Sequence, residues 1–175
     1  MAVRLLPLTV SELCGHALEL ERDCEQRFRE YTTQMHAVGA HGLANVFEDL
    51  AQQGMSDIAA LEAASGTHKA AELSPWEYAW KLTYMPEGME NHPRLVPRNG
   101  REALQLAVQA KRRALAFYND VAENARDAVV RGCAAEMATG EKDLLKRLER
   151  MLASEILGDK PQPGAGGSGG DRLAS

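Results

Sequence analysis

Two six-residue stretches that lie 90 residues apart decide the fold of this sequence. They are Ala17-Leu18-Glu19-Leu20-Glu21-Arg22 and Ala107-Val108-Gln109-Ala110-Lys111-Arg112. Both are rich in good helix formers, and Phe28 and Tyr118 extend the match at the same offset. The match indicates that the chain contains two related helices.

A second match lies further along each half, at an offset of 86 residues. It places Gln53-Gly54-Met55-Ser56-Asp57-Ile58 over Thr139-Gly140-Glu141-Lys142-Asp143-Leu144. We interpret the difference between the two offsets as a difference in loop length. Each half is therefore predicted to form a pair of helices.

Proline limits where these helices can lie. The tracts 8–74 and 98–160 contain no proline, which costs about 3 kcal/mol inside a helix. Each tract has one internal break near glycine or asparagine. The sequence predicts four helices, over residues 9–37, 41–65, 100–124 and 127–157.

Two of the predicted helices begin with the same signal. Thr9 is followed by Glu12, and Asn99 is followed by Glu102. This is the spacing of a capping box, in which the first side chain bonds to free backbone N–H groups of the first turn.

Length and composition indicate a single globular domain. The chain has 175 residues, of which 45% are hydrophobic and 26% charged. A net charge of −5 disfavours nucleic-acid binding, because no basic surplus exists to neutralise phosphates. Three widely spaced cysteines without a CxxC pair exclude a disulfide scaffold, a zinc ribbon and a rubredoxin-type iron centre. No apolar stretch is long enough for a signal peptide or a membrane span, so we expect a cytoplasmic protein.

Two segments differ in composition from the helices. Residues 66–99 hold four prolines, both tryptophans and two of the four tyrosines, and we interpret them as a crossover that carries the chain along a bundle. The Gly/Pro/Ser-rich residues 158–175 are predicted to be a disordered, flexible tail. The expected organisation is a four-helix bundle over 1–157 followed by that tail.

Apolar residues recur every three or four positions and predict one inward face on each helix. On the fourth helix the expected inward positions are Val130, Cys133, Met137, Gly140, Leu144 and Met151. Six inward positions in the whole bundle are unusual for a core: Glu21, Gly54, Asp57, Lys111, Gly140 and Asp143. We expect each of the two glycines to leave space for water or for the lysine stem.

Four strings carry a resemblance to a known family. They are Ala-Leu-Glu-Leu-Glu-Arg-Asp (17–23), Val-Phe-Glu-Asp-Leu-Ala-Gln-Gln (46–53), Ala-Lys-Arg-Arg-Ala-Leu-Ala-Phe-Tyr (110–118) and Ala-Ala-Glu-Met-Ala (134–138). Over residues 9–157 the sequence resembles the rubrerythrin-like branch of the ferritin-like superfamily. The resemblance implies an all-α, ferritin-like four-helix bundle of two helix pairs joined by a long crossover. It also implies a two-iron site, built from a glutamate on each of the first and third helices and a Glu-x-x-His on each of the others.

Carried over position by position, the resemblance implies that five of the six ligand positions have changed. The glutamate of the first helix is kept as Glu21. The substituted positions are Gly54, Asp57, Lys111, Gly140 and Asp143. The inference about the fold survives these changes, whereas the inference about iron chemistry does not.

Lys111 dominates the chemistry expected at these positions. An ammonium has no lone pair for a metal, and a like unit charge about 4 Å away costs about 4 kcal/mol at an effective dielectric constant of 20. We predict a salt-bridge core in which this lysine balances Glu21, Asp57 and Asp143 and lowers their pKa values. One alternative is a variant metal site formed by the same three carboxylates with the lysine turned away. Another, by analogy with metal-free oxidases of the ribonucleotide reductase group, is a redox site that uses Lys111 and Tyr118.

These considerations favour a non-catalytic protein that needs no cofactor. We expect a structural or partner subunit, either a homodimer or a hetero-oligomer with another ferritin-like protein, that binds neither nucleic acid nor membrane. The alternative is a di-metal, iron-dependent oxidoreductase or iron-handling protein with an altered site.

Overall fold

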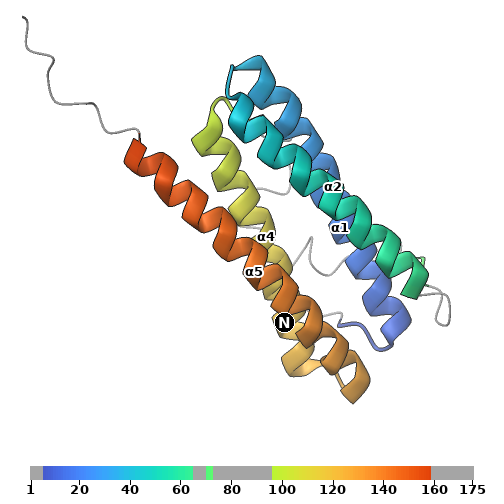
Figure 1. The fold of residues 1–175 in the computed structure, drawn as a ribbon. Helices are drawn as coiled ribbons and strands as arrows, with labels where there is room; N and C mark the ends of the chain where they lie inside the picture. The colour runs from blue at the N-terminus through green and yellow to red at the C-terminus, as the bar shows by residue number, and fades with distance from the viewer. Residues whose placement is uncertain (1–5, 65–69, 73–95, 159–175) are drawn as a thin grey trace, which may run out of the picture.

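The computed structural model describes residues 6–64, 70–72 and 96–158 of the chain (Figure 1). These residues form four helices and no strand: α1 (Val10–Ala37), α2 (His41–Ala64), α4 (Gly100–Asn124) and α5 (Ala128–Gly158). The four helices predicted from the sequence are confirmed, and each predicted end lies within one residue of the observed one.

The first helix of each pair begins with the same capping arrangement. The side-chain oxygen of Thr9 accepts a hydrogen bond from the backbone N–H of Glu12 at 3.1 Å, and that of Asn99 accepts one from Glu102 at 2.9 Å. Each glutamate carboxylate in turn accepts a bond from the backbone N–H of the residue before the cap, at 2.7 and 2.9 Å. These bonds satisfy N–H groups that have no partner inside a helix. The predicted capping residues are therefore confirmed.

Glycine is required at the turn between α1 and α2. Gly39 has a φ of 78°, a left-handed conformation that side chains disfavour. Its N–H donates to the carbonyl of His36 at 3.1 Å, and the N–H of Ala40 donates to that of Met35 at 2.8 Å. This pair of bonds is a Schellman motif, which ends α1 and reverses the chain into α2.

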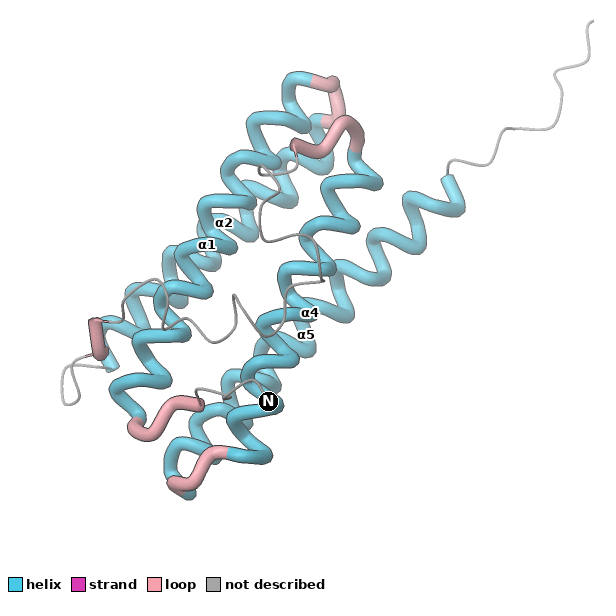
Figure 2. Tube along the Cα trace, turned by 180° about the vertical axis from the view of Figure 1, so that it is seen from behind, coloured by secondary structure: helices cyan, strands magenta, loops and turns pink. Residues whose placement is uncertain are grey.

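The helices are arranged as two antiparallel pairs. α1 packs along α2 and α4 packs along α5, while α1 also contacts both α4 and α5 and so joins the pairs. The connecting turns lie at the ends of the bundle (Figure 2). Figure 1 shows that α2 ends at the end of the bundle opposite to the one where α4 begins. The two helix ends that the predicted crossover has to join therefore lie at opposite ends of the bundle.

Two sequence predictions fall outside the described residues. The crossover is described only at 70–72 and from residue 96 onward, so the packing expected of its aromatic side chains is not covered. The tail is described only at Gly158, the last residue of α5.

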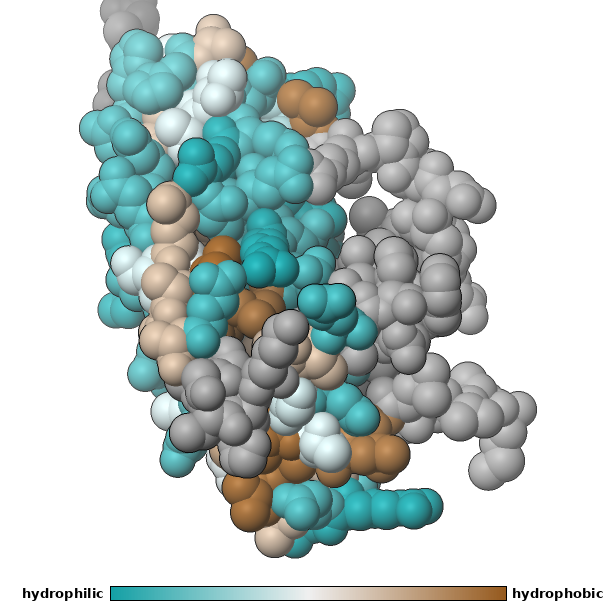
Figure 3. All heavy atoms as spheres, turned by 90° about the vertical axis from the view of Figure 1, so that its right-hand side faces the viewer, coloured by the Kyte–Doolittle hydropathy of each residue, from teal (hydrophilic) through white to brown (hydrophobic). Residues whose placement is uncertain are grey.

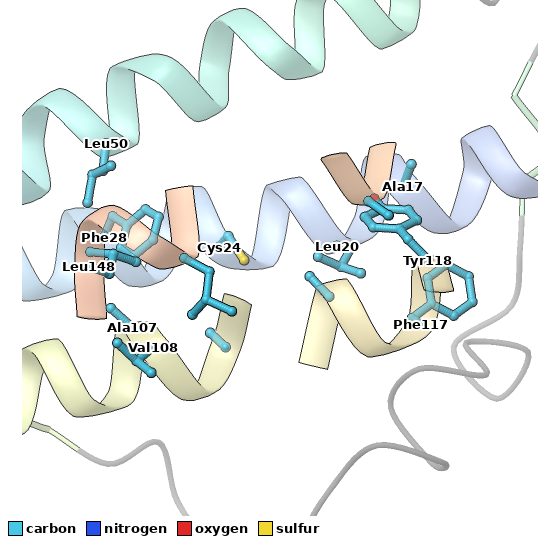
Figure 4. Close-up of a cluster of buried hydrophobic side chains, with 14 of the residues drawn as sticks. Ala17, Leu20, Cys24, Phe28, Leu50, Ala107, Val108, Phe117, Tyr118 and Leu148 are labelled. Atoms are coloured by element: carbon cyan, nitrogen blue, oxygen red, sulfur yellow. The ribbon is translucent and has the colours of Figure 1, made fainter. Parts of the chain in front are cut away.

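Apolar side chains from all four helices form one core (Figure 4). The inward faces that the apolar spacing predicts for α1 and α4 are confirmed, because all but one of the predicted positions are buried and Leu115 is half-buried. The predicted positions that are buried are Cys14, Ala17, Glu21, Cys24, Phe28, Tyr31, Met35, Leu104, Val108, Lys111, Tyr118 and Val121. The face in Figure 3 is mainly hydrophilic, with apolar side chains in a few areas. In the part of the chain that the structure describes, no helix combines the length and apolar composition needed to cross a lipid bilayer.

The inward face predicted for α5 is wrong by one position. The buried residues of this helix are Val130, Ala134, Ala138, Glu141, Leu145 and Leu148. Gly140 is exposed, and Met137 and Leu144 are half-buried. The helix carries two adjacent apolar stripes: one lies in the core, and the stripe with Met137, Gly140 and Leu144 lines a cavity shared with α2.

Candidate functional site

A lysine lies buried between two glutamates near the middle of the bundle. Lys111 of α4 is 2% exposed, and its Nζ donates to Oε1 of Glu141 at 3.0 Å and to Oε2 of Glu21 at 3.4 Å. The two glutamates come from α5 and α1, so three helices contribute to this arrangement. We refer to Glu21, Lys111 and Glu141 as the triad.

Glu141, and not Asp143, is the second acidic partner of the lysine. The side chain of Asp143 is 76% exposed, and its carboxylate lies 3.7 Å from Nζ of Lys146 on the surface of α5. The expectation that Asp143 belongs to the buried cluster is therefore wrong.

The error comes from the alignment of the two halves. Buried positions of α2 and α5 pair at an offset of 87 residues, in the pairs Phe47 and Ala134, Ala51 and Ala138, and Gly54 and Glu141. The sequence match instead superposed two glycines, Gly54 and Gly140, which are not equivalent. Moving one position along a helix turns a side chain by about 100°, which replaces a core position by one on the cavity wall.

The two glycines have different surroundings. A Cβ atom built on Gly54 would lie 3.3 Å from Cβ of Glu25, so this glycine allows α1 and α2 to approach closely. A Cβ atom on Gly140 would meet nothing within 4 Å. The expectation that each glycine leaves free space is confirmed for Gly140 and wrong for Gly54.

Asp57 also lies apart from the triad. It is exposed on α2, where its carboxylate accepts a hydrogen bond from Nε2 of Gln53 at 2.9 Å. Of the four ionisable residues that the sequence places inward, the structure brings Glu21 and Lys111 together and leaves Asp57 and Asp143 outside.

Burial and charge compete at the triad. Burial lowers the pKa of Lys111, but the carboxylates of Glu21 and Glu141, and at alkaline pH the thiolate of Cys24, raise it well above its usual value. Burial raises the pKa of Glu141 to about 7, and the nearby Glu21 adds to the rise, although Lys111 opposes it. Lys111 thus lowers the pKa of this partner, which the sequence did not predict, but burial outweighs its effect.

Two other reactive groups near the triad stay protonated at neutral pH. Burial raises the pKa of the Cys24 thiol to about 12. Burial and the charges of Glu21 and Glu141 raise the pKa of the Tyr118 phenol well above its usual value. Figure 4 shows both side chains among the apolar residues of the core, Cys24 on α1 and Tyr118 on α4.

A cavity of about 710 Å³ adjoins the triad and is lined by residues of all four helices. Its inner wall contains the triad and Tyr118. Exposed polar residues form its rim: Asp49, Gln53 and Asp57 from α2, and Arg147 from α5. The apolar lining is Ala17, Leu50, Ala60, Leu61, Met137 and Leu144.

The donor set does not fit a two-iron site. The positively charged Nζ of Lys111 occupies the space between the carboxylates of Glu21 and Glu141, where a metal ion would have to lie. The described residues contain no group of three or more His, Cys, Asp or Glu side chains that could hold a metal ion. The alternative ligand set, Glu21 with Asp57 and Asp143, does not converge on one point.

Glu141 is the functional residue that the sequence prediction missed. A signal for it was present, because Ala134, Ala138, Glu141, Leu145 and Leu148 follow the alternating four- and three-residue spacing of a buried helix face. Larger apolar residues on the neighbouring stripe, such as Met137 and Leu144, obscured that spacing.

Comparisons with known proteins identify the fold but no activity. No protein-family profile matches the chain, and no curated protein does so. The chain is similar to a solved structure of an uncharacterised conserved protein from Magnetospirillum magnetotacticum MS-1, with a TM-score of 0.69 and 24% sequence identity. The match covers 90% of this chain and 99% of that chain. At this identity the likeness shows the fold alone, an all-α four-helix bundle.

Proposed function

We propose that this chain is a metal-free relative of the rubrerythrin-like branch of the ferritin-like superfamily and acts as a non-catalytic structural or partner subunit. The observation that carries the proposal is the position of Lys111, whose Nζ lies 3.0 Å and 3.4 Å from two buried carboxylates. In this proposal the ammonium group supplies the positive charge that metal ions supply in an iron-binding bundle.

The energetics of the triad support this proposal. A divalent metal ion ligated by both Glu21 and Glu141 would have to displace the ammonium of Lys111 or lie next to it. Removing one partner from a buried ion pair costs about 3–5 kcal/mol, and a like charge about 4 Å away costs about 4 kcal/mol at an effective dielectric constant of 20. Either cost would reduce the affinity for a metal by more than a hundredfold.

The state of the neighbouring reactive groups supports a non-catalytic role. With pKa values raised by burial, Cys24 is not a thiolate and Tyr118 is not a phenolate at neutral pH. The proposal requires no cofactor. It places the protein in the cytoplasm, a compartment that keeps free thiols such as those of Cys14, Cys24 and Cys133 reduced.

The partner in this proposal is a second bundle, either another copy of the chain or a different ferritin-like protein. Several large apolar side chains of the described residues are exposed and available for such contacts: Leu8, Val38, Met55, Val96 and Val129. Light scattering on the purified chain, alone and after co-expression with a candidate partner, tests for assembly. A chain that remains a monomer under both conditions would contradict the partner role.

Metal analysis tests the metal-free state. We expect the chain, purified after expression with added iron, to contain far less than one iron per molecule. The Lys111→Glu variant replaces the ammonium by a third carboxylate, and we expect it to gain affinity for divalent metal. Two irons per wild-type chain, or peroxidase or ferroxidase turnover that a chelator abolishes, would support the alternative, an iron-dependent oxidoreductase with an altered site.

A further inference from the structure

One acceptor atom of the triad receives no hydrogen bond. Oε1 of Glu141 accepts from Nζ of Lys111, whereas Oε2 of Glu141 is buried and no N–H or O–H group among the described residues donates to it. The carboxyl group of Glu21 lies within hydrogen-bonding reach of Glu141 and can share a proton with it. Leaving a buried acceptor unsatisfied costs free energy, because the atom has lost its contacts with water. Glu141 lines the cavity, so a rotation of its carboxylate toward the cavity would let a bound molecule supply the missing donor.

The triad also lacks one positive charge. Two carboxylates, Glu21 and Glu141, face a single ammonium, and the nearby Cys24 and Tyr118 are neutral in their protonated forms. When both glutamates are ionised, the buried group carries a net charge of −1. One added monovalent cation makes the group neutral, whereas a divalent metal ion leaves an excess positive charge beside Lys111.

The rest of the cavity favours a cation with an apolar body. Four of the ionisable side chains that line it are acidic and two are basic; they are Glu21, Asp49, Asp57, Glu141, Lys111 and Arg147. The apolar part of the lining includes the side chains of Leu50, Leu61, Met137 and Leu144. A volume of about 710 Å³ is within the range of pockets that bind small organic molecules.

We propose that this cavity binds a small organic monocation, whose ammonium group donates a hydrogen bond to the carboxylate of Glu141 and whose apolar body lies among Leu50, Met137 and Leu144. The inference rests on the metal-free state of the triad proposed above. The raised pKa of Glu141 agrees with it, since in the absence of a cation a proton supplies the missing positive charge.

Three probes of equal chain length test the charge of the ligand: n-hexylammonium, 1-hexanol and hexanoate. Isothermal titration calorimetry on the full chain measures their binding. We expect hexylammonium to bind, hexanol to bind at least tenfold more weakly and hexanoate not to bind. From butylammonium to hexylammonium, we expect each added methylene to tighten binding by about fourfold if it is buried in the apolar part of the cavity.

Two variants test the place of binding. Glu141→Gln removes the carboxylate, and we expect at least a tenfold loss of hexylammonium affinity. Glu136→Gln makes the same chemical change at an exposed position of α5 and is the matched control. Gly140→Leu fills the cavity from its wall without altering the triad, and we expect it to weaken hexylammonium more than butylammonium. Circular dichroism shows whether each variant has kept the helical content of the wild type.

Several results would overturn the proposal. Equal binding of hexanol and hexylammonium would indicate a purely apolar cavity, and preferential binding of hexanoate would reverse the charge assignment. Full binding by a folded Glu141→Gln variant, or no binding of any alkylammonium by the wild type, would also refute it. Equal stabilisation by potassium chloride and hexylammonium chloride would assign an inorganic cation instead. Each result is obtained with protein of known iron content, so it is distinct from a failure of the metal-free proposal.

Discussion

Glu141 shows how one residue responds to opposing influences. Its carboxylate accepts a hydrogen bond from the ammonium of Lys111 at 3.0 Å, which favours the ionised form. Burial and the negative charge of Glu21 favour the protonated form, and together they raise the pKa of Glu141 to about 7. An ion pair in a folded protein therefore does not by itself lower the pKa of its acid, because desolvation can outweigh the attraction.

The raised pKa of Glu141 predicts a specific dependence of stability on pH. The folded state holds this proton up to about pH 7, whereas the unfolded chain releases it near pH 4.3. Between these two values the folded state binds more protons, so this residue makes the free energy of unfolding fall as pH rises, by up to about 4 kcal/mol. Above pH 7 and below pH 4 its contribution is constant.

The Glu141→Gln variant isolates this effect. Urea unfolding from pH 4 to pH 9 gives the free energy of unfolding for the variant and the wild type, and their difference removes the contribution of other titrating groups. We expect that difference to change between about pH 4.5 and pH 7 and to be flat above. A difference that is the same at all pH values would mean that Glu141 titrates normally in the folded protein.

At the scale of single helices, the ends were easier to predict than the buried face of α5. Thr9 and Asn99 form local hydrogen bonds within one turn, so residues close in sequence determine where α1 and α4 begin. Which of the two apolar stripes of α5 is buried depends on the helix against which each stripe packs. Ala138 lies in the core and Met137 lines the cavity, although both are apolar, and the sequence alone does not distinguish a core from a cavity wall.

The two interior glycines give a prediction for α2 and α5. Alanine in place of a helical glycine stabilises by about 0.5–1 kcal/mol where the added methyl group meets no obstacle. We expect Gly140→Ala to gain this amount, since nothing lies within 4 Å of its Cβ position. Gly54→Ala should gain less or lose stability, because Cβ of Glu25 is only 3.3 Å away and must move. Thermal and urea unfolding of both variants test the order, and a larger gain at Gly54 would contradict it.

At the scale of the whole molecule, the internal sequence repeat predicted the two helix pairs but not all of the side chains that form the triad. Two helix pairs follow from the pattern around Glu21 and Lys111, and the structure places these residues 3.4 Å apart. The third member, Glu141, required the correct register of α5 against α2, which a short match containing two glycines did not provide. The cavity depends on how the two pairs are spaced, and that spacing has no signature in local sequence.

The position of the triad predicts how the two helix pairs are held together. The ion pair of Glu21 with Lys111 joins α1 to α4 and hence one helix pair to the other. The ion pair of Arg112 with Glu149 joins α4 to α5, within one helix pair, at 2.6 Å, and the two side chains are 62% and 39% exposed to solvent. By distance alone the ion pair of Arg112 with Glu149 would be the stronger. Solvent screening, however, reduces the stabilisation from an exposed ion pair to below about 1 kcal/mol.

Two double-mutant cycles compare these ion pairs. One combines Glu21→Gln with Lys111→Met, and the other combines Arg112→Met with Glu149→Gln. Urea unfolding at pH 8, above the pKa of about 7 of the neighbouring Glu141, gives the coupling free energy of each cycle. We expect a coupling of about 1–3 kcal/mol for the buried pair, because either single change leaves a charged or polar group without its partner in the core. A coupling for Glu21 and Lys111 no larger than that for Arg112 and Glu149 would mean that the triad does not hold the two halves together, and that apolar contacts in the core do so instead.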